Sequence, residues 1–331
     1  MKRLVLPLVA ARRVAWSLAA LPSCAMAHAS DADFSTWHSH WSFEPWVVCL
    51  LAVSATLYAA GVVKLWRHAG HGRGITRAQA AAFAAGWLFL VVALVSPVDA
   101  LGGQLFSAHM VQHETLMLLA APMLVLGRPL AAWAWALPMT WRRGVGAFFH
   151  SRGWRVPWRI VTGALAAWLL HAAALWLWHL PALFEAALAN EAIHTFQHLT
   201  FLFTALLFWW SVLGATTRRD RGIALVSLFT TFVHTGALGA LLTLARTDWY
   251  PSYAATAPAF HLTPLQDQQI GGLIMWIPAG AIYLVSGLFL AARWMAPATR
   301  RRAYSAAASR RPGLLAEAVR HADPHAPRRS E

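Results

Sequence analysis

Seven long apolar runs constrain the fold of this chain more than any other feature, because each is about as long as a membrane-spanning helix. A helix rises about 1.5 Å per residue, so about 20 residues cross the hydrocarbon layer of about 30 Å. The runs cover residues 46–66, 78–95, 109–126, 160–178, 194–213, 222–245 and 271–294. A shorter apolar piece, residues 129–141, is expected to lie at the interface or to pack against the bundle. The pattern predicts an all-α, polytopic membrane bundle of seven transmembrane helices.

The composition of the chain points to the same surroundings. Of its 331 residues, 58% are hydrophobic and 12% are charged, against about 25% charged in an average soluble domain. The 19 tryptophans are a surplus of the kind found where aromatic rings line the two membrane interfaces. We therefore expect the lipid bilayer to be the solvent of this protein.

The formal charge of +14 would suit a nucleic-acid-binding protein, but the positions of the basic residues indicate another cause. Of the 27 Lys and Arg, 22 fall in the first, third and fifth connections and on the C-terminal side, and four in the first 13 residues. The second, fourth and sixth connections hold only Arg246. This alternation follows the positive-inside rule. It predicts a multi-pass membrane protein with its N-terminus outside and its C-terminus in the cytoplasm, and no nucleic-acid partner.

The ends of the chain differ from the apolar middle. Residues 1–27 resemble a cleaved signal peptide, with a basic start, a short apolar core and an Ala25-Met26-Ala27 cleavage site. We expect a periplasmic leader over residues 28–45, a transmembrane domain over 46–294, and a basic, disordered cytoplasmic tail over 295–331. The leader carries a His-x-His between Trp37 and Trp41, which is expected to be a solvated segment.

One short motif occurs twice at corresponding places of two predicted helices. His109-Met110-Val111-Gln112-His113 opens the third run, and His194-Thr195-Phe196-Gln197-His198 opens the fifth. Residues four apart lie on one face of a helix, with Cβ atoms about 5–6 Å apart. Each copy therefore presents two imidazoles side by side, an arrangement with which helices bind metal ions.

Further histidines are predicted near the same membrane face. His179 ends the fourth run at the outer face, where the repeated motifs also begin, whereas His171 and His234 lie deeper in their helices. Ionisable side chains inside a bilayer are costly and indicate function by default. A single buried His is more often a hydrogen-bonding residue between helices, but the duplicated motif favours a metal or cofactor site.

The ligand types favour copper. Met110 adjoins His109, and Met117 lies one turn beyond His113; thioether and imidazole together suit copper. The two cysteines are Cys24, inside the predicted signal peptide, and Cys49, so a Cys-x-x-Cys copper site is excluded. Acidic residues near the outer ends are candidate hydrogen-bond partners for the imidazoles: Asp99, Glu114, Glu185, Glu191, Asp248 and Asp267. The predicted metal ligands are His109, His113, His179, His194, His198, Met110 and Met117.

Several short pieces of the chain, taken together, are similar to one known family. They include Ser96-Pro97, Leu101-Gly102, the first His-x-x-Gln-His, Ala121-Pro122, Leu126-Gly127-Arg128-Pro129, Trp178-His179-x-Pro181, His194 with His198, and Asp267-Gln268-Gln269-x-Gly271-Gly272 before Met275-Trp276. On these pieces the chain resembles the CtaG-type cytochrome c oxidase assembly factors, which are multi-span bacterial membrane proteins. The resemblance implies a place in the bacterial inner (plasma) membrane and a non-catalytic role in maturing a haem–copper oxidase through its copper centre, with the oxidase subunits as partners.

Two other functions stay open on the residues alone. A haem-binding redox protein would use His171, His234 or the paired imidazoles as axial ligands. A di-iron oxidase would use the histidines as His boxes, although such clusters are expected on the cytoplasmic side. The assembly factor is the preferred hypothesis.

The predicted topology has a direct test. A reporter enzyme active only outside the cytoplasm should work when fused after Leu101 or Leu188 and fail after Arg143 or Arg219, because the basic connections are retained inside. Activity of the Arg219 fusion would place the two His-x-x-Gln-His motifs on opposite sides of the membrane and exclude a shared site.

Overall fold

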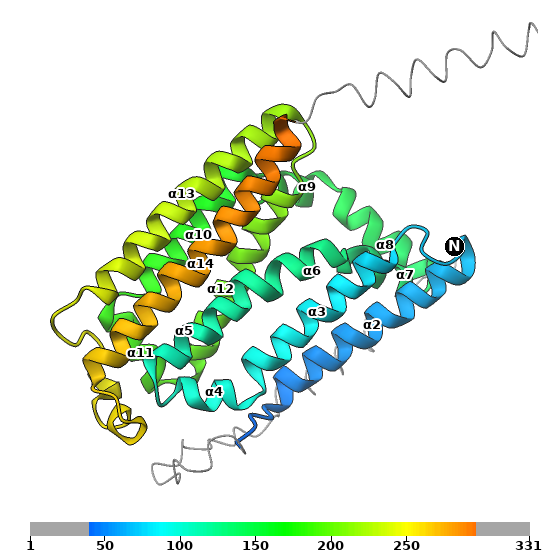
Figure 1. The fold of residues 1–331 in the computed structure, drawn as a ribbon. Helices are drawn as coiled ribbons and strands as arrows, with labels where there is room; N and C mark the ends of the chain where they lie inside the picture. The colour runs from blue at the N-terminus through cyan, green and yellow to red at the C-terminus, as the bar shows by residue number, and fades with distance from the viewer. Residues whose placement is uncertain (1–39, 296–331) are drawn as a thin grey trace, which may run out of the picture. The chain divides into compact units, whose positions relative to one another are not determined.

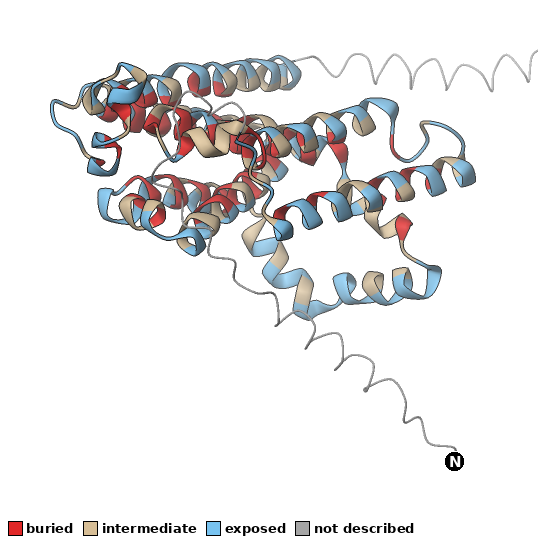
Figure 2. Cartoon of the chain, turned by 90° about the horizontal axis from the view of Figure 1, so that it is seen from below, coloured by how far each residue is buried: buried red, intermediate tan, exposed pale blue. Residues whose placement is uncertain are grey.

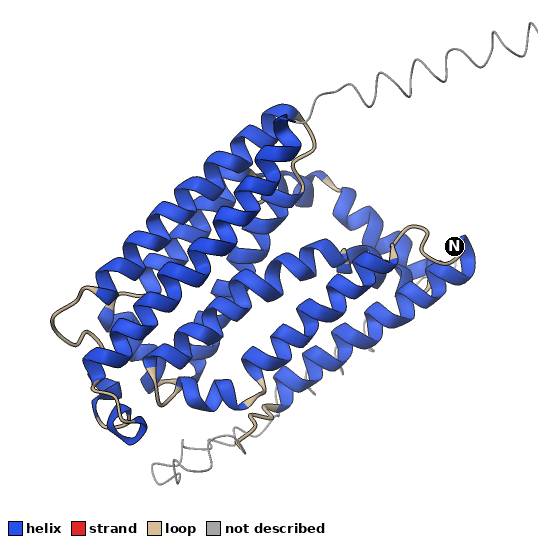
Figure 3. Cartoon of the chain, viewed as in Figure 1, coloured by secondary structure: helices blue, strands red, loops and turns tan. Residues whose placement is uncertain are grey.

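The structure, a computed structural model, describes residues 40–295, and these form helices joined by short connections (Figures 1 and 3). Within this part, six helical stretches are long and apolar enough to cross a membrane. They are α2 (Pro45–Ala69), α3 (Arg77–Leu94), a composite helix (Phe106–Gly127), α12 (Glu191–Leu213), α13 (Arg218–Thr243) and α14 (Pro264–Met295). The predicted signal peptide, all but the end of the predicted leader, and the predicted tail after Met295 lie outside the described residues.

The fourth apolar run is not the single straight helix that its length predicts. The chain forms α9 (Arg152–Val161) and α10 (Ala164–Trp178), and their axes differ by 62°. The hydroxyl of Thr162 donates to the carbonyl of Trp158 at 2.6 Å, and Gly163 is extended with ψ 139°. Such side-chain back-bonding bends helices, and glycine favours a break. The described part therefore has six spans, or seven if this bent pair is one.

The composite helix is the most buried of the spanning stretches, and it contacts α3, α12 and α14 (Figure 1). It consists of α5 (Phe106–Glu114), the π-helical turn η2 (Thr115–Ala120) and α6 (Ala121–Gly127). The wide turn ends next to Pro122, which has no N–H to donate. The carbonyl of Met117, inside this turn, accepts the indole N–H of Trp209 at 2.9 Å. The first histidine motif thus belongs to the helix at the centre of the packing.

Short elements complete the fold: α4 (Pro97–Gly102), α7 (Pro129–Ala136), α8 (Met139–His150), α11 (Pro181–Ala189), η3 (Pro251–Ala254) and η4 (Ala257–Phe260). Helix α7 packs on α2, where Gly61 faces the backbone of Ala132 and the Trp133 indole donates to the Ser54 carbonyl at 3.1 Å. The prediction that the apolar piece 129–141 packs against the bundle is confirmed for α7.

The outward faces of the helices are apolar. Buried residues lie between helices, whereas the outer faces are exposed (Figure 2). Large side chains such as Leu88, Phe229 and Phe289 are more than half exposed, which water would disfavour and lipid chains accommodate. The protein is a multi-pass membrane protein.

Helices α13 and α14 make the most extensive helix pair, and their contact depends on glycine. A Cβ atom at Gly239 would lie 2.8 Å from the carbonyl oxygen of Gly272 and 2.9 Å from the backbone nitrogen of Trp276. Small residues at such crossings let backbones approach closely, which is the main source of helix association in membranes.

Adding a methyl group at this crossing should therefore destabilise the bundle. We expect Gly239→Ala to lower the free energy of unfolding by about 1–3 kcal/mol, since the opposing atoms are backbone and cannot move aside. Thermal unfolding in detergent micelles measures the effect. Gly287→Ala on α14 is the matched control: a Cβ atom added there would meet nothing within 4 Å, and alanine favours a helix, so this variant should melt no lower than the native protein. Equal melting temperatures for both variants would contradict the close-packed crossing.

Candidate metal centre

Three imidazoles from two helices meet at one end of the bundle. The ligand nitrogens of His109 on α5 and of His194 and His198 on α12 all lie within 4.8 Å of one another. Ring centroids are 5.3 Å apart between His109 and His194, and 4.2 Å apart between His194 and His198. His109 is 1% exposed and His198 9%. The two His-x-x-Gln-His motifs therefore face each other, in a geometry that allows three imidazoles to share one metal ion.

His113 and His179 adjoin this group. The His113 ring is 4.3 Å from that of His109 and 5.1 Å from that of His198, and neither of its nitrogens has a hydrogen-bond partner. His179, which follows α10, is close enough to His109 and His113 for electrostatic interaction. All five predicted imidazole ligands are thus near one another, with three of them close enough to share an ion.

The hydrogen bonds of two imidazoles determine which nitrogen is free to bind. Nδ1 of His109 lies 3.3 Å from the Gly102 carbonyl, and Nδ1 of His179 lies 2.7 Å from the Leu175 carbonyl. A carbonyl oxygen only accepts, so each Nδ1 carries the proton and each Nε2 keeps its lone pair. Both Nε2 atoms are buried without a hydrogen-bond partner. This is the arrangement of a metal-ligating histidine, whose other nitrogen is held by a second group.

The two predicted thioether ligands occupy different surroundings. Met110 packs with Phe106, Leu238 and Met275, where its side chain contacts Gly271 of α14. Met117 lies in the apolar core beside Phe201 and Trp209, within the π-helical turn. As metal ligands, Met110 and Met117 remain predictions.

The glutamines of the repeated motif are not equivalent. The Gln112 amide donates to the Ala93 carbonyl at 2.7 Å and to the Asp99 carboxylate at 2.6 Å, and so ties α5 to α3 and α4. Gln197 is equally buried and lies beside His109, but its amide atoms have no hydrogen bond of ordinary geometry. Gln112 is therefore a structural anchor, whereas Gln197 is a polar group facing the histidines.

The carboxylate of Asp267 caps α5 from a distant part of the chain. It is 0% exposed and accepts from the backbone N–H of Phe106 at 2.6 Å and of Ser107 at 3.0 Å. The residue before α5, Leu105, makes no side-chain cap of its own. The first N–H groups of a helix need hydrogen-bond acceptors and carry partial positive charge. A carboxylate accepts these hydrogen bonds, and its negative charge is attracted to the helix start. Asp267 thus fixes the start of the helix that carries His109 and His113.

The residues after Asp267 hold the loop between α13 and α14, which contacts the backbone near the histidines. Gln268 accepts from the backbone of Trp249 at 2.7 Å, and Gln269 donates to the Ala245 carbonyl at 3.0 Å. From this loop, Tyr250 donates to the His179 carbonyl at 2.8 Å and Tyr253 donates to the Gly102 carbonyl at 3.0 Å. Burial, followed by the nearby Asp267 and Glu185 carboxylates, raises the pKa of Tyr253 well above its ordinary value, so its hydroxyl stays a donor.

The prediction that carboxylates hold the imidazoles is wrong for His109 and His179. Backbone carbonyls hold these two rings, while Asp99 and Asp267 bind an amide and a helix start. Sequence reasoning also missed Phe184 on α11, whose ring lies 5.0 Å from that of His109. The local sequence Leu183-Phe184-Glu185 does not predict this contact, because it forms between two different helices.

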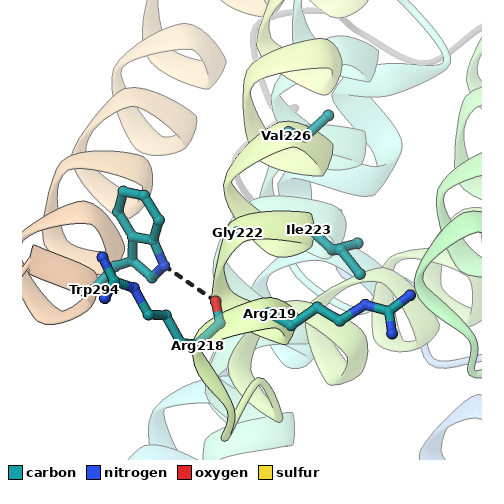
Figure 4. A pocket seen from close by; sticks show the side chains of 6 residues that line it. All are labelled: Arg218, Arg219, Gly222, Ile223, Val226 and Trp294. Atoms are coloured by element: carbon teal, nitrogen blue, oxygen red, sulfur yellow. Dashed lines mark hydrogen bonds between the residues drawn. The ribbon is translucent and has the colours of Figure 1, made fainter.

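A surface pocket at the other end of α13 is separate from these histidines (Figure 4). The Trp294 indole donates there to the Arg218 carbonyl at 3.1 Å, and the Arg218 guanidinium stacks over its ring. The pocket is lined by Arg218, Arg219, Gly222, Ile223, Val226 and Trp294. None of these is a metal ligand of the type gathered at the histidines.

Removing the carboxylate of Asp267 should loosen the histidine end of the bundle. Asp267→Ala leaves two buried N–H groups without an acceptor. We therefore expect the free energy of unfolding in micelles to fall by about 2–5 kcal/mol. Asp267→Asn keeps one acceptor oxygen and should lose less. Asp248→Ala, at an exposed position of the connection between α13 and α14, serves as the control. If Asp267→Ala were as stable as Asp248→Ala, the capping role would be wrong.

Comparison with known proteins agrees with this architecture. Residues 56–296 match the cytochrome c oxidase caa3 assembly factor family, Caa3_CtaG. Uncharacterized proteins of Mycobacterium bovis and Mycobacterium tuberculosis are each 28% identical over 247 residues, covering 71% of this chain and 36% of theirs. A Mycobacterium leprae protein is 27% identical over 270 residues, 77% of this chain and 39% of its own. The chain thus spans less than half the length of these relatives, and no solved structure matches it. By its family match over most of its length, the chain belongs to the cytochrome c oxidase caa3 assembly factor family.

Proposed function

We propose that this protein binds a copper ion through His109, His194 and His198 and supports maturation of the copper centre of a haem–copper oxidase. The observation that carries the proposal is the approach of these three nitrogens within 4.8 Å, from two helices that each repeat the same motif. Copper is cargo in this account, taken up at the site and passed on to the oxidase subunits, which are the proposed partners.

The donor set supports a transition metal of the copper or zinc class. Neutral imidazole suits zinc, copper, iron and nickel, and the three groups within reach are all imidazoles. A di-iron site of the carboxylate type would need glutamates among the ligands. We choose copper among these metals because the family is one of oxidase assembly factors. Copper is the metal of a haem–copper oxidase that a protein with three imidazole ligands could bind and deliver.

The basic residues indicate which membrane side the site faces. His109 lies near the start of the composite helix and Arg128 follows its end; His194 lies near the start of α12 and Arg218 follows its end. The histidines and arginines are therefore at opposite ends of the same helices. By the positive-inside rule, the histidines face the outside of a bacterial inner membrane.

The packing around the histidines explains how the chain would hold the ion. Asp267 and Gln112 fix α5, the Gly102 carbonyl orients His109, and the Phe184 ring packs between the rings of His109 and Tyr250. Pre-oriented imidazoles bind a metal more tightly, because ordering the ligands costs less on binding.

The test is the copper content of the oxidase in cells. A strain lacking the protein should make oxidase subunits with low activity and too little copper, and His198→Leu should reproduce this defect. Loss of an outer hydrogen-bond partner costs about 10–100-fold in metal affinity, so loss of a ligand should cost at least as much. His68→Leu changes an exposed histidine at the C-terminal end of α2, which carries no site residue. This variant should behave like the native protein. Normal oxidase copper with an accumulated His198→Leu protein would overturn the proposal.

A further inference from the structure

A second group of buried nitrogens lies deeper in the bundle, away from the three histidines already described. His171 on α10 is 1% exposed, and its Nε2 has no hydrogen-bond partner. On α13, both ring nitrogens of His234 are buried and without a partner, as is the indole nitrogen of Trp168 on α10. Unsatisfied polar groups inside a bilayer are costly, so the three imidazole nitrogens in one region point to a ligand.

These groups come together from neighbouring helices. Helix α10 packs on both α12 and α13. The rings of Trp168 and His234 are 5.8 Å apart, and Trp168 and His171 are three residues apart on α10, hence on one face. His171 and His234 are close enough to interact electrostatically. The two imidazoles therefore both adjoin the face of α10 that carries Trp168 and His171.

Hydrogen bonds determine which nitrogen of His171 is available. Nδ1 of His171 lies 3.3 Å from the Thr204 hydroxyl oxygen, and that hydroxyl donates its proton to the Phe201 carbonyl at 3.3 Å. The Thr204 oxygen can then only accept from His171, so Nδ1 carries the proton and Nε2 keeps its lone pair. His234 offers a second imidazole lone pair. Two neutral nitrogen donors in an apolar setting suit a monovalent soft cation better than a divalent one, because less charge must be buried.

The two histidine groups lie beside different levels of α12, one after the other along its axis. His198 belongs to the first group, and Thr204, six residues further, contacts His171; six residues correspond to about 9 Å along a helix. Phe201 lies between them, with its ring 4.6 Å from that of His113 and 6.1 Å from that of His179. The positions of His113 and His179 make them intermediate between the two groups.

We infer that His171 and His234 form a second copper site, which holds Cu(I) between two imidazoles inside the bundle. The identity of the ion rests on the proposed function, whereas the existence of the site does not. When Cu(I) moves between the two sites, it exchanges neutral imidazole ligands for neutral imidazole ligands, so it stays Cu(I) and no electron or proton is transferred. The second site gives the protein a place to keep copper shielded from water.

Copper stoichiometry tests this inference. The full chain, purified in detergent without oxygen, is titrated with Cu(I) against bicinchoninate as the competing chelator. The native protein should bind two ions, and His171→Leu and His234→Leu should each bind one. The double variant should also bind one, since two ligands of one site act as a unit. His150→Leu, an exposed histidine of α8, should keep both ions.

The outcomes separate this inference from the proposed function. His198→Leu should keep the deep ion and lose the other. Two ions bound by the His171→Leu, His234→Leu double variant would overturn the second site and leave the first intact. Loss of the only bound ion in that double variant, with no effect of His198→Leu, would support the deep site and overturn the proposed one. Leu at position 234 removes an unsatisfied imidazole, so His234→Leu should melt no lower than the native protein when metal-free, which separates loss of copper from loss of fold.

Discussion

The contact between the Asp267 carboxylate and the first N–H groups of α5 is the interaction on which the histidine site depends most. In a bilayer these N–H groups have no water to bond, and the sequence before α5 supplies no cap of its own. Asp267 supplies both acceptor and charge from α14, which also packs on α13 through Gly239 and Gly272. The orientation of His109 and His113 thus follows from how α14 is seated in the bundle.

Gly271 makes this seating possible. A Cβ atom there would lie 2.4 Å from the ring of Phe106, which is the residue whose N–H bonds to Asp267. The absent side chain lets the start of α5 approach α14 closely enough for the carboxylate to reach it. The run Asp267-Gln268-Gln269 with Gly271-Gly272 therefore does three things: it caps α5, holds the loop between α13 and α14, and lets α14 pack closely on its neighbours.

Much of this was accessible from sequence, because hydrophobic length and basic-residue placement are local properties. The spanning helices α2, α3, α12, α13 and α14 follow from them, and the repeated motif contains the imidazoles that lie near one another. The bend at Thr162-Gly163 was missed, since an apolar run does not reveal a backbone break. The role of Asp267 was also missed: its partner Phe106 lies 161 residues earlier, and only the packing brings them together. Gln112 and Gln197 look alike in sequence, but Asp99 and Ala93 adjoin only the first.

The central claim is that His109, His194 and His198 bind one ion together. X-ray absorption at the copper edge, on the His171→Leu, His234→Leu protein loaded with one equivalent of Cu(I), measures the ligands directly and excludes the deeper pair. The account predicts a nitrogen shell with the outer-ring scattering of about three imidazoles, at the bond length of about 2.0 Å typical of imidazole ligands. A shell of one imidazole or none, or one dominated by sulfur, would contradict it.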